Sequence, residues 1–281
     1  MIKQSDLDYC IKHKKNIIFE GKAGIGKTAV MLSTFRRHYG EDFLYFSAST
    51  MDPWTDLIGV PQRKEVIQNG QPISVLEFVK PEKLALAKVR AIAIDEFNRA
   101  PKKVKNCLME AIQFKTINGV PIPNLEVVWA AINPFDDDEH NYDVEEMDQA
   151  QLDRFHLHVK FKYTVDPSYF SSKYGSSVGN AACSWWMALD QKKKFALSPR
   201  RLDAAVEVLL DGGPIEYVIP AGIDSSQFAE SIKDPIIKTL TEISKKNDKA
   251  AATKLLTENA KSKDFMLRIM GGIANAANSK K

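Results

Sequence analysis

A glycine-rich segment near the start of the chain has the spacing of a phosphate-binding loop. It follows the pattern G-x-x-x-x-G-K-[ST], and its members are Gly21, Lys22, Ala23, Gly24, Ile25, Gly26, Lys27 and Thr28. Its glycines allow backbone N–H groups to turn toward phosphate oxygens, Lys27 can reach the outer phosphates, and the Thr28 hydroxyl can bind Mg²⁺. The segment predicts binding of a nucleoside triphosphate with Mg²⁺; a glycine-rich turn with a chance lysine is the alternative.

Two carboxylates follow an apolar run further along the chain. Residues 91–94 are Ala-Ile-Ala-Ile, and Asp95 and Glu96 come directly after them. A buried strand would bring Asp95 to the Mg²⁺ ion, which it would contact through water, and would place Glu96 to polarise the attacking water. The pair predicts hydrolysis of the nucleotide; two solvated acids at a strand end are the alternative.

The residues with this chemistry lie at the ends of predicted strands. Short apolar runs predict strands at residues 16–20, 43–47, 91–94, 127–132 and 156–161, and helical patterns occur at residues 5–15, 28–39 and 102–113. Such alternation is typical of a parallel sheet with helices on both faces, so the sequence predicts an α/β fold. Further along, residues 178–190, 199–210 and the segments after residue 234 predict a small all-α domain.

Composition places the chain among folded globular proteins. Of its 281 residues, 44% are hydrophobic and 27% are charged, and the net charge of +3 is too small to identify a nucleic-acid or membrane binder. Cys10, Cys107 and Cys183 lie far apart and outside zinc-ligand spacing, so neither a disulfide framework nor a zinc site is expected. Because no signal peptide or membrane span is recognisable, we expect a cytoplasmic location, or the host cytoplasm if the chain is viral.

Charge is distributed unevenly along the chain. Residues 136–148 hold eight acidic residues in thirteen, and residues 233–281 hold eleven Lys or Arg against five Asp or Glu. Solvated surfaces are the first interpretation. A subunit or partner contact is the alternative for the acidic segment, and an acidic partner or nucleic acid for the basic one. His156 and His158 would share one strand face, but no third ligand is near in sequence, so we interpret them as core or edge histidines.

Six segments resemble, in order, those of the MoxR-type AAA+ ATPases. Residues 95–101, DEFNRAP, are similar to the family's D-E-[IF]-N-R-A-P signature. The other similar segments are residues 76–81, 108–112, 131–134, 149–155 and 197–200, which resemble FEFxPGP, LLEAM, ATQNP, EAQLDRF and SPR. Glu82 stands where the family usually has glycine. The resemblance covers about residues 15–210.

This resemblance implies a two-part organisation. Residues 1–163 would form an AAA+ P-loop NTPase core, and residues 164–281 an α-helical lid with a basic C-terminal segment. Residues 49–81 would hold the family's helix-2 insertion, with residues 56–59 near its DLxG motif. Such insertions face the central pore of a ring and engage a client, whereas a packed surface loop with Trp54 as a buried anchor is the alternative.

The resemblance also implies roles for three polar residues. Asn133 would be sensor 1, which positions the lytic water or contacts the γ-phosphate; a strand-terminating turn is the alternative. Arg154 would be the arginine finger that enters the neighbouring subunit's site; an ordinary ion pair with Asp153 or with the acidic segment at residues 136–148 is the alternative. Arg200 would be sensor 2 on the lid, although the adjacent Arg201 could take that role.

The implied function is Mg²⁺-dependent ATP hydrolysis by a hexameric homo-oligomer that remodels or assembles a protein client, with help from a separate von Willebrand-type partner. A DNA-acting or McrB-like restriction motor is one alternative, against which stand the missing N-K-x-D guanine motif and the proline after Asn133. A slow nucleotide-gated scaffold or adaptor is another. Nucleic acid is the less favoured partner, and no membrane association is expected.

Overall fold

A parallel sheet of five strands forms the centre of the first of two compact units, Met1–Lys162. The computed structural model describes residues 2–85, 88–135, 146–245, 249–258, 265–267 and 269. The strands are β1 (Ile17–Glu20), β2 (Phe43–Ser47), β5 (Ala91–Asp95), β8 (Val127–Ile132) and β9 (Leu157–Lys160), in the spatial order β2-β5-β8-β1-β9. The prediction of an α/β fold with a parallel sheet is confirmed.

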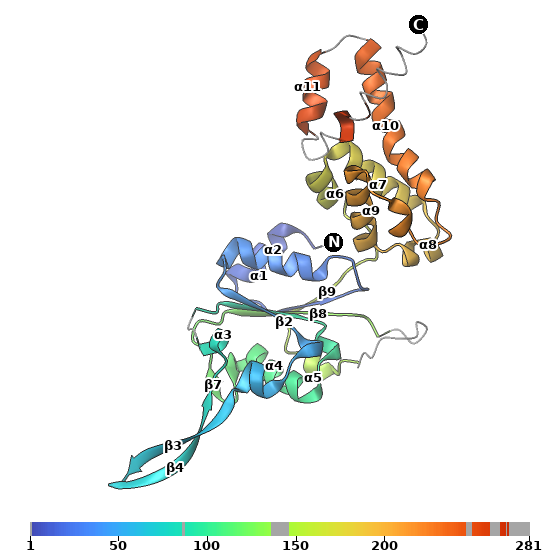
Figure 1. Cartoon of the computed structure of the whole chain (residues 1–281). Helices are drawn as coiled ribbons and strands as arrows, with labels where there is room; N and C mark the ends of the chain where they lie inside the picture. The colour runs from blue at the N-terminus through green and yellow to red at the C-terminus, as the bar shows by residue number, and fades with distance from the viewer. Residues whose placement is uncertain are drawn as a thin grey trace. The chain divides into compact units, whose positions relative to one another are not determined.

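Helices cover both faces of this sheet. α1 (Gln4–Lys12) and α2 (Lys27–Tyr39) lie on one face, and α3 (Glu82–Ala85), α4 (Lys102–Phe114) and α5 (Gln149–Leu152) lie on the other (Figure 1). Strand side chains alternate between two cores, since Phe19 and Trp129 pack in the core on the α1–α2 side and Ile92 packs in the core on the α4 side. Because both faces are buried, the strands have continuous apolar sequences.

The strand order decides which turns of the chain meet. β8 lies between β1 and β5, with Glu20 paired with Ile132 and Ile94 paired with Ala130. The carboxyl ends of these strands therefore form one edge of the sheet. The same parallel pairing places Leu157, the first residue of β9, beside Ile17, so residues that precede β9 lie at the opposite, amino edge.

The segment between β2 and β5 contains a long β-hairpin. After the short turns η1 (Ala48–Thr50) and η2 (Trp54–Ile58), β3 (Val60–Gln68) pairs antiparallel with β4 (Gln71–Val79). Asn69 and Gly70 form the turn with φ of 52° and 79°, the left-handed values that a two-residue hairpin turn requires. The hairpin extends away from the sheet (Figure 1). The sequence analysis expected an insertion at residues 49–81 but did not predict that it contains a hairpin.

A second, short hairpin follows α4. Its strands are β6 (Thr116–Ile117) and β7 (Val120–Pro121), which pair antiparallel. The sequence analysis did not predict it, because two-residue strands are too short for a periodic pattern. Ile117 and Ile122 are buried against the α4 side of the sheet and fix the hairpin to the core.

A buried asparagine joins several elements at the amino edge of the sheet. Asn16, 3% exposed, donates from Nδ2 to the Ile112 carbonyl of α4 at 2.8 Å. Its Oδ1 accepts from the Val128 backbone N–H of β8 at 2.9 Å and from Lys115 Nζ at 3.1 Å. Its own backbone N–H donates to His156 Nδ1 at 3.0 Å. Asn16 thus satisfies groups from three elements, and His156 is a hydrogen-bonded residue at the edge of the core.

The ammonium group of Lys115 in this cluster makes stability depend on pH. Burial lowers the pKa of Lys115 to about 8. The folded state therefore binds fewer protons than the unfolded state between that pH and the ordinary lysine value of 10.5, and the free energy of unfolding should rise with pH in this window. We expect Lys115→Met to remove this contribution. The free energy of unfolding of the wild type, relative to that of the variant, should therefore rise from pH 7.5 to pH 10, as measured by denaturant unfolding.

The matched control for this prediction is Lys102→Met on the same helix. Lys102 is exposed and lies at the other end of α4, outside the Asn16 cluster, and it serves as the reference for a lysine-to-methionine change. If the difference in the free energy of unfolding between Lys115→Met and wild type is the same at pH 7.5 and pH 10, Lys115 is not the source of the pH dependence.

All the described secondary-structure elements of the second unit, Tyr163–Lys281, are helices. Its helices are α6 (Pro167–Tyr174), α7 (Ser176–Ala188), α8 (Gln191–Ala196), α9 (Pro199–Asp211), α10 (Ser225–Lys245) and α11 (Lys249–Glu258), with the short turn η4 (Ile215–Tyr217) after α9. Asp203 ties α6 to α9, because it accepts from Lys173 Nζ at 2.8 Å and from the Tyr174 hydroxyl at 2.7 Å. The indole of Trp186 donates to the Leu197 carbonyl at 2.6 Å within the same core. The prediction of a helical region after the sheet is confirmed.

Two further sequence-based expectations concern the whole chain. Cys10 and Cys183 are buried and Cys107 is half-buried, and none of the three forms a disulfide. Among the helices that the structure describes, none combines the length and apolar character needed to cross a bilayer.

Candidate active site

The glycine-rich segment forms the turn between β1 and α2. Gly26 caps α2 with φ of 91°, a left-handed value that a side chain would strain, and Lys27 is the first residue of the helix. The amino end of α2, where the helix dipole is positive, therefore lies beside the loop, as binding of phosphate requires.

Lys27 is held inside the loop. Its side chain is 7% exposed, and Nζ donates to the Gly21 carbonyl at 2.5 Å, to the Lys22 carbonyl at 2.9 Å and to Asn133 Oδ1 at 3.1 Å. The ammonium group is thus fixed between the turn after β1 and the turn after β8. A phosphate oxygen at this position would receive a charge-assisted hydrogen bond from a donor that is already in place.

Thr28 and Asp95 meet at the same edge of the sheet. The Thr28 hydroxyl donates to Asp95 Oδ2 at 2.6 Å, and the Tyr45 hydroxyl lies 3.4 Å from the same oxygen. A hydroxyl and a carboxylate are oxygen ligands of the kind that Mg²⁺ prefers. The donor set therefore fits a magnesium ion, which Thr28 and Asp95 would hold.

Glu96 follows Asp95 in an uncommon backbone conformation. Its φ of 52° lies in the left-handed region, which only a few per cent of non-glycine residues adopt. The carboxylate accepts from Ser49 Oγ at 2.8 Å and from Arg99 Nη1 at 2.9 Å, and the side chain is 34% exposed. Both carboxylate oxygens are therefore held by hydrogen bonds, while the side chain as a whole stays partly exposed.

Asn98, two residues after Glu96, reaches the turn after β8. Its Nδ2 donates to the Asn133 carbonyl at 2.7 Å, and its Oδ1 lies 3.4 Å from the Asn133 backbone N–H. The residues predicted for phosphate binding, Mg²⁺ binding, water activation and sensor 1 are thus gathered at one edge of the sheet.

Arg154 lies away from this group within the same chain. It precedes β9 and so belongs to the amino edge, where its Nε donates to Gln113 Oε1 at 2.9 Å and its Nη1 to the Ala150 carbonyl at 2.6 Å. Asp153 instead accepts from Gln149 Nε2 at 2.6 Å. The described residues include no ion pair of Arg154 with Asp153, which was one of the two alternative partners of this arginine. The other, the acidic segment, lies mostly outside the described residues.

The remaining sequence-predicted residues have the following local surroundings. Arg200 is exposed in the first turn of α9 in the second unit, and Arg201 next to it turns its Nη1 toward the Ala196 carbonyl at 3.5 Å. His158 Nε2 contacts Glu20 Oε2 at 2.6 Å on neighbouring strands. Most of the acidic segment, residues 136–145, lies outside the described residues.

Sequence analysis missed Ser49 and assigned no role to Asn98 or Arg99. A signal for Ser49 exists, since it comes directly after a strand that would end at the same edge as Asp95 if the two strands paired. Asn98 and Arg99 lie within the DEFNRAP signature, but their contacts depend on which turns are neighbours in space.

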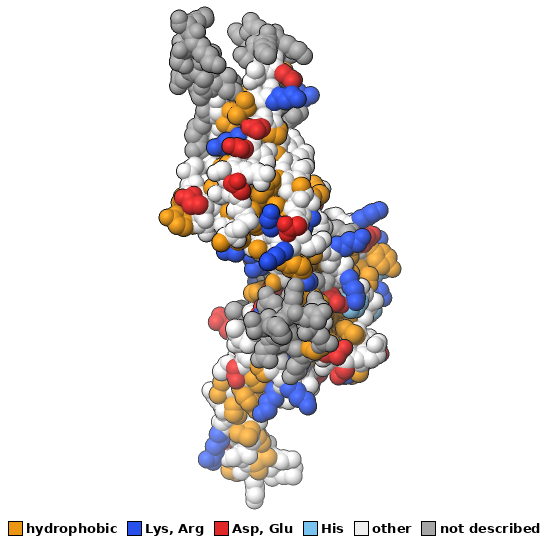
Figure 2. Space-filling model, turned by 90° about the vertical axis from the view of Figure 1, so that its right-hand side faces the viewer, with side chains coloured by type: hydrophobic (Ala, Val, Ile, Leu, Met, Phe, Trp, Pro, Cys, Tyr) orange, Lys and Arg blue, Asp and Glu red, His pale blue; other side chains and the backbone are white. Residues whose placement is uncertain are grey.

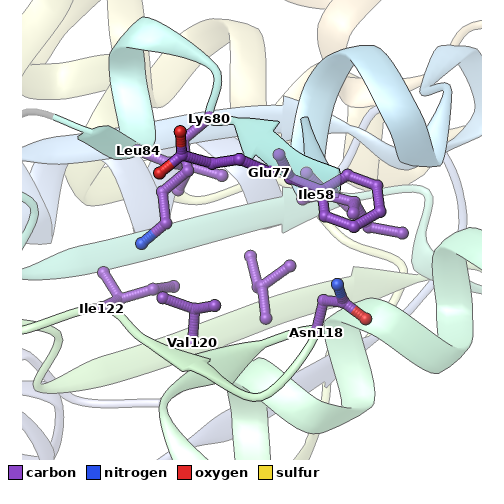
Figure 3. Close-up of a pocket in the computed structure, with 10 residues that line it drawn as sticks. Ile58, Glu77, Lys80, Leu84, Asn118, Val120 and Ile122 are labelled. Carbon is purple, nitrogen blue, oxygen red and sulfur yellow. The ribbon is translucent and has the colours of Figure 1, made fainter. Parts of the chain in front are cut away.

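A cavity of about 280 Å³ lies at the base of the long hairpin (Figure 3). Its walls come from η2, β4, α3 and the short β6–β7 hairpin, and most of its lining is apolar. The lining residues are Leu57, Ile58, Glu77, Phe78, Lys80, Leu84, Ile117, Asn118, Val120 and Ile122. None of them belongs to the group at the carboxyl edge, so this recess is separate from the candidate nucleotide site.

Comparison with known proteins gives matches among solved structures alone. No protein-family model and no curated protein matches the sequence. A Cytophaga hutchinsonii protein assigned as an ATPase shares 19% identity over 83% of this chain, with a TM-score of 0.38, and the chain spans only 57% of that protein. A mutant of RuvB from Thermotoga maritima shares 14% identity over 92% of this chain and 85% of its own, with a TM-score of 0.44. A full-length MCM homolog from Methanopyrus kandleri shares 13% identity over 95% of this chain and 55% of its own, with a TM-score of 0.36. Such low TM-scores carry no argument about this chain, and the inferences below rest on its own residues.

Proposed function

We propose that this chain is a Mg²⁺-dependent ATPase of the MoxR-type AAA+ family that works as a ring-shaped homo-oligomer, with six subunits as in the family, on a protein client. Bound ATP would lie with its phosphates along the loop at residues 21–28, and Mg²⁺ would be held by Thr28 and, through water, by Asp95. Glu96 would take the proton of the attacking water, and Asn133 would orient that water or the γ-phosphate.

One observation carries the hydrolytic part of this proposal. Lys27 contacts Asn133, Thr28 contacts Asp95, and Glu96 directly follows Asp95, so residues more than a hundred positions apart in sequence converge at one edge of the sheet. A loop that only bound phosphate would need neither the acid pair nor the amide beside it. The combination favours activation of a water molecule on a bound triphosphate.

The proposed protein client is supported by the surface of the long hairpin. Val60, Ile67, Ile73, Leu76 and Val79 are exposed there, Ile67 and Leu76 by more than 70%. Figure 2 shows hydrophobic side chains along this hairpin. Residues 60–79 also contain two basic and two acidic residues, so the hairpin carries no net positive charge for a nucleic acid. Exposed apolar side chains of this number mark an interaction surface and favour protein over DNA.

The recess at the base of the hairpin extends this apolar surface. Val120 and Ile122 point into it from one wall, and Glu77 and Lys80 lie on the wall opposite (Figure 3). Lys64 on β3 pairs with Glu77 at 2.7 Å. In this proposal, an apolar side chain of the client would occupy the recess.

The proposal is tested by the purified protein with ATP and Mg²⁺. We expect phosphate release that requires Mg²⁺, and Lys27→Ala should weaken ATP binding roughly 10- to 100-fold because it removes a charged donor to the phosphates. Lys14→Ala, which removes an exposed lysine 3.9 Å from Glu126 at the other edge of the sheet, is the matched control. Equal ATP binding by Lys27→Ala and wild type, or a preference for GTP with strongly salt-dependent DNA binding, would overturn the proposal.

A slow nucleotide-gated scaffold is the second candidate function, and one observation favours it. Ser49 and Arg99 both occupy the carboxylate of Glu96, so the general base is engaged by the protein itself. A basal turnover that rises little when a client or partner is added would support the scaffold over the remodelling ring.

A further inference from the structure

The side chain of Asn98 is one of the few buried polar groups of the first unit. It is 2% exposed, yet it belongs to the turn that follows the hydrolytic acid pair. Burial of a carboxamide costs free energy unless its donors and acceptor are paired. Its position therefore depends on hydrogen-bond partners, and those partners are the two peptide groups of Asn133 described above.

The contacts of Asn98 are directed at the backbone of Asn133, whereas the Asn133 side chain contacts Lys27. Nδ2 of Asn98 donates to the carbonyl and Oδ1 faces the N–H of one residue, so the carboxamide spans that residue on both sides. The Oδ1 of Asn133 then accepts from Lys27 Nζ at 3.1 Å. Any movement of the turn after β8 would move the Asn133 amide relative to the phosphate loop.

We propose that Asn98 is a positioning residue for the hydrolytic step, which acts by fixing the backbone of Asn133 so that its side-chain amide stays aligned with Lys27 and with the water beside Glu96. This inference rests on the proposed ATPase function. Asn98 touches neither nucleotide nor water in this scheme, and its whole effect on turnover passes through Asn133. A displacement of about 1 Å at a reacting group can cost roughly 100-fold in rate, so a residue of this kind affects kcat strongly.

The chain offers a matched control at the other end of the same strand. Asn16 is also buried, at 3% exposed, and its carboxamide also holds the backbone of β8, where Oδ1 accepts from Val128 N–H. It does so at the amino edge, away from the loop and the acid pair. Loss of Asn16 should therefore lower stability without a selective effect on turnover.

The experiment is steady-state ATP hydrolysis by the full chain with Asn98→Ala, Asn133→Ala, the double variant and Asn16→Ala, with ATP binding and the midpoint of thermal unfolding measured for each. We expect Asn98→Ala to lower kcat roughly 10- to 100-fold with KM and ATP affinity changed less than about threefold. In the Asn133→Ala background the same change should lower kcat by less than about threefold, because the amide that Asn98 positions is already gone. Asn16→Ala should lower the unfolding midpoint and keep kcat within about threefold of wild type.

Asn98→Asp keeps the shape of the side chain and serves if Asn98→Ala does not fold. It replaces the donor that faces the Asn133 carbonyl with an oxygen, so the same selective fall in kcat is expected. Two results would overturn this inference and leave the ATPase proposal intact. In the first, the wild type hydrolyses ATP and both Asn98 variants have the same kcat as the wild type. In the second, Asn98→Ala lowers kcat by the same factor in the wild-type and the Asn133→Ala backgrounds. A wild-type protein that binds ATP but does not hydrolyse it would overturn the ATPase proposal first, and the positioning role with it.

Discussion

Glu96→Gln is expected to lower ATP turnover by about 10²- to 10⁴-fold while ATP remains bound. Glutamine keeps the size of the side chain and an oxygen that can accept from Ser49 or Arg99, but it cannot take a proton from water. The loop, Lys27 and the Thr28–Asp95 pair are unchanged. Phosphate release at saturating ATP would measure the loss, and retention of a fluorescent ATP analogue would measure binding.

Glu126→Gln provides the control for this prediction. Glu126 is likewise a partly buried carboxylate bound by an arginine, since Oε1 accepts from Arg90 Nη2 at 2.6 Å, but it lies at the amino edge of the sheet just before β8. We expect its replacement to leave kcat close to wild type. If Glu96→Gln hydrolyses ATP at the wild-type rate, Glu96 is not the general base and the proposed mechanism fails.

Arg154→Ala is expected to lower turnover by about 10³- to 10⁵-fold, the range that arginine fingers contribute elsewhere, without loss of ATP binding in the same subunit. The reason is the position of Arg154 at the amino edge, held by Gln113 and the Ala150 carbonyl, away from its own phosphate loop. In our proposal the guanidinium serves the neighbouring subunit. Removal should therefore affect the hydrolytic step and not the binding of nucleotide.

Assemblies that mix two variants test directly whether Arg154 acts in the site of the neighbouring subunit. At an ATP concentration near the wild-type dissociation constant, Lys27→Ala subunits should be mostly empty and Arg154→Ala subunits should turn over almost no ATP. An equal mixture should regain about one quarter of the wild-type rate, because one interface in four then joins an intact loop to an intact arginine. Arg36→Ala is the control, since Arg36 is an exposed arginine 3.9 Å from Glu41 on the surface of α2. A mixture that stays inactive, although light scattering shows mixed oligomers, would contradict the assignment of Arg154.

The glycine-rich turn between β1 and α2 and the α/β core could be predicted from sequence for physical reasons. The loop is a contiguous pattern, and the strands are buried on both faces, so each reads as an unbroken apolar run. The hairpin lacks that signal. Its strands are exposed on both faces and mix apolar residues with charges such as Arg63, Lys64 and Glu65, which hides the alternation of a strand. The Asn69-Gly70 turn was the one local signal available.

The contacts inside the candidate site could not be predicted in the same way. Asn98 meets Asn133 only because β8 lies next to β5, and Ser49 meets Glu96 only because β2 lies on the other side of β5. Strand order is a property of the whole sheet, and no local pattern specifies it. The sequence therefore indicated candidate site residues, whereas their contacts with one another became visible only in the fold.

The separation of Arg154 from the phosphate loop has a consequence for assembly geometry. The loop lies at the carboxyl edge of the sheet and Arg154 at the amino edge, so in the proposed assembly the surface that gives the arginine and the surface that receives it would be different. Subunits related in this way would join head to tail through a heterologous contact, which closes into a ring or continues as a filament. Any open chain of subunits has one terminal site that lacks its arginine. Activity per subunit should therefore reach its full value only when the last contact closes.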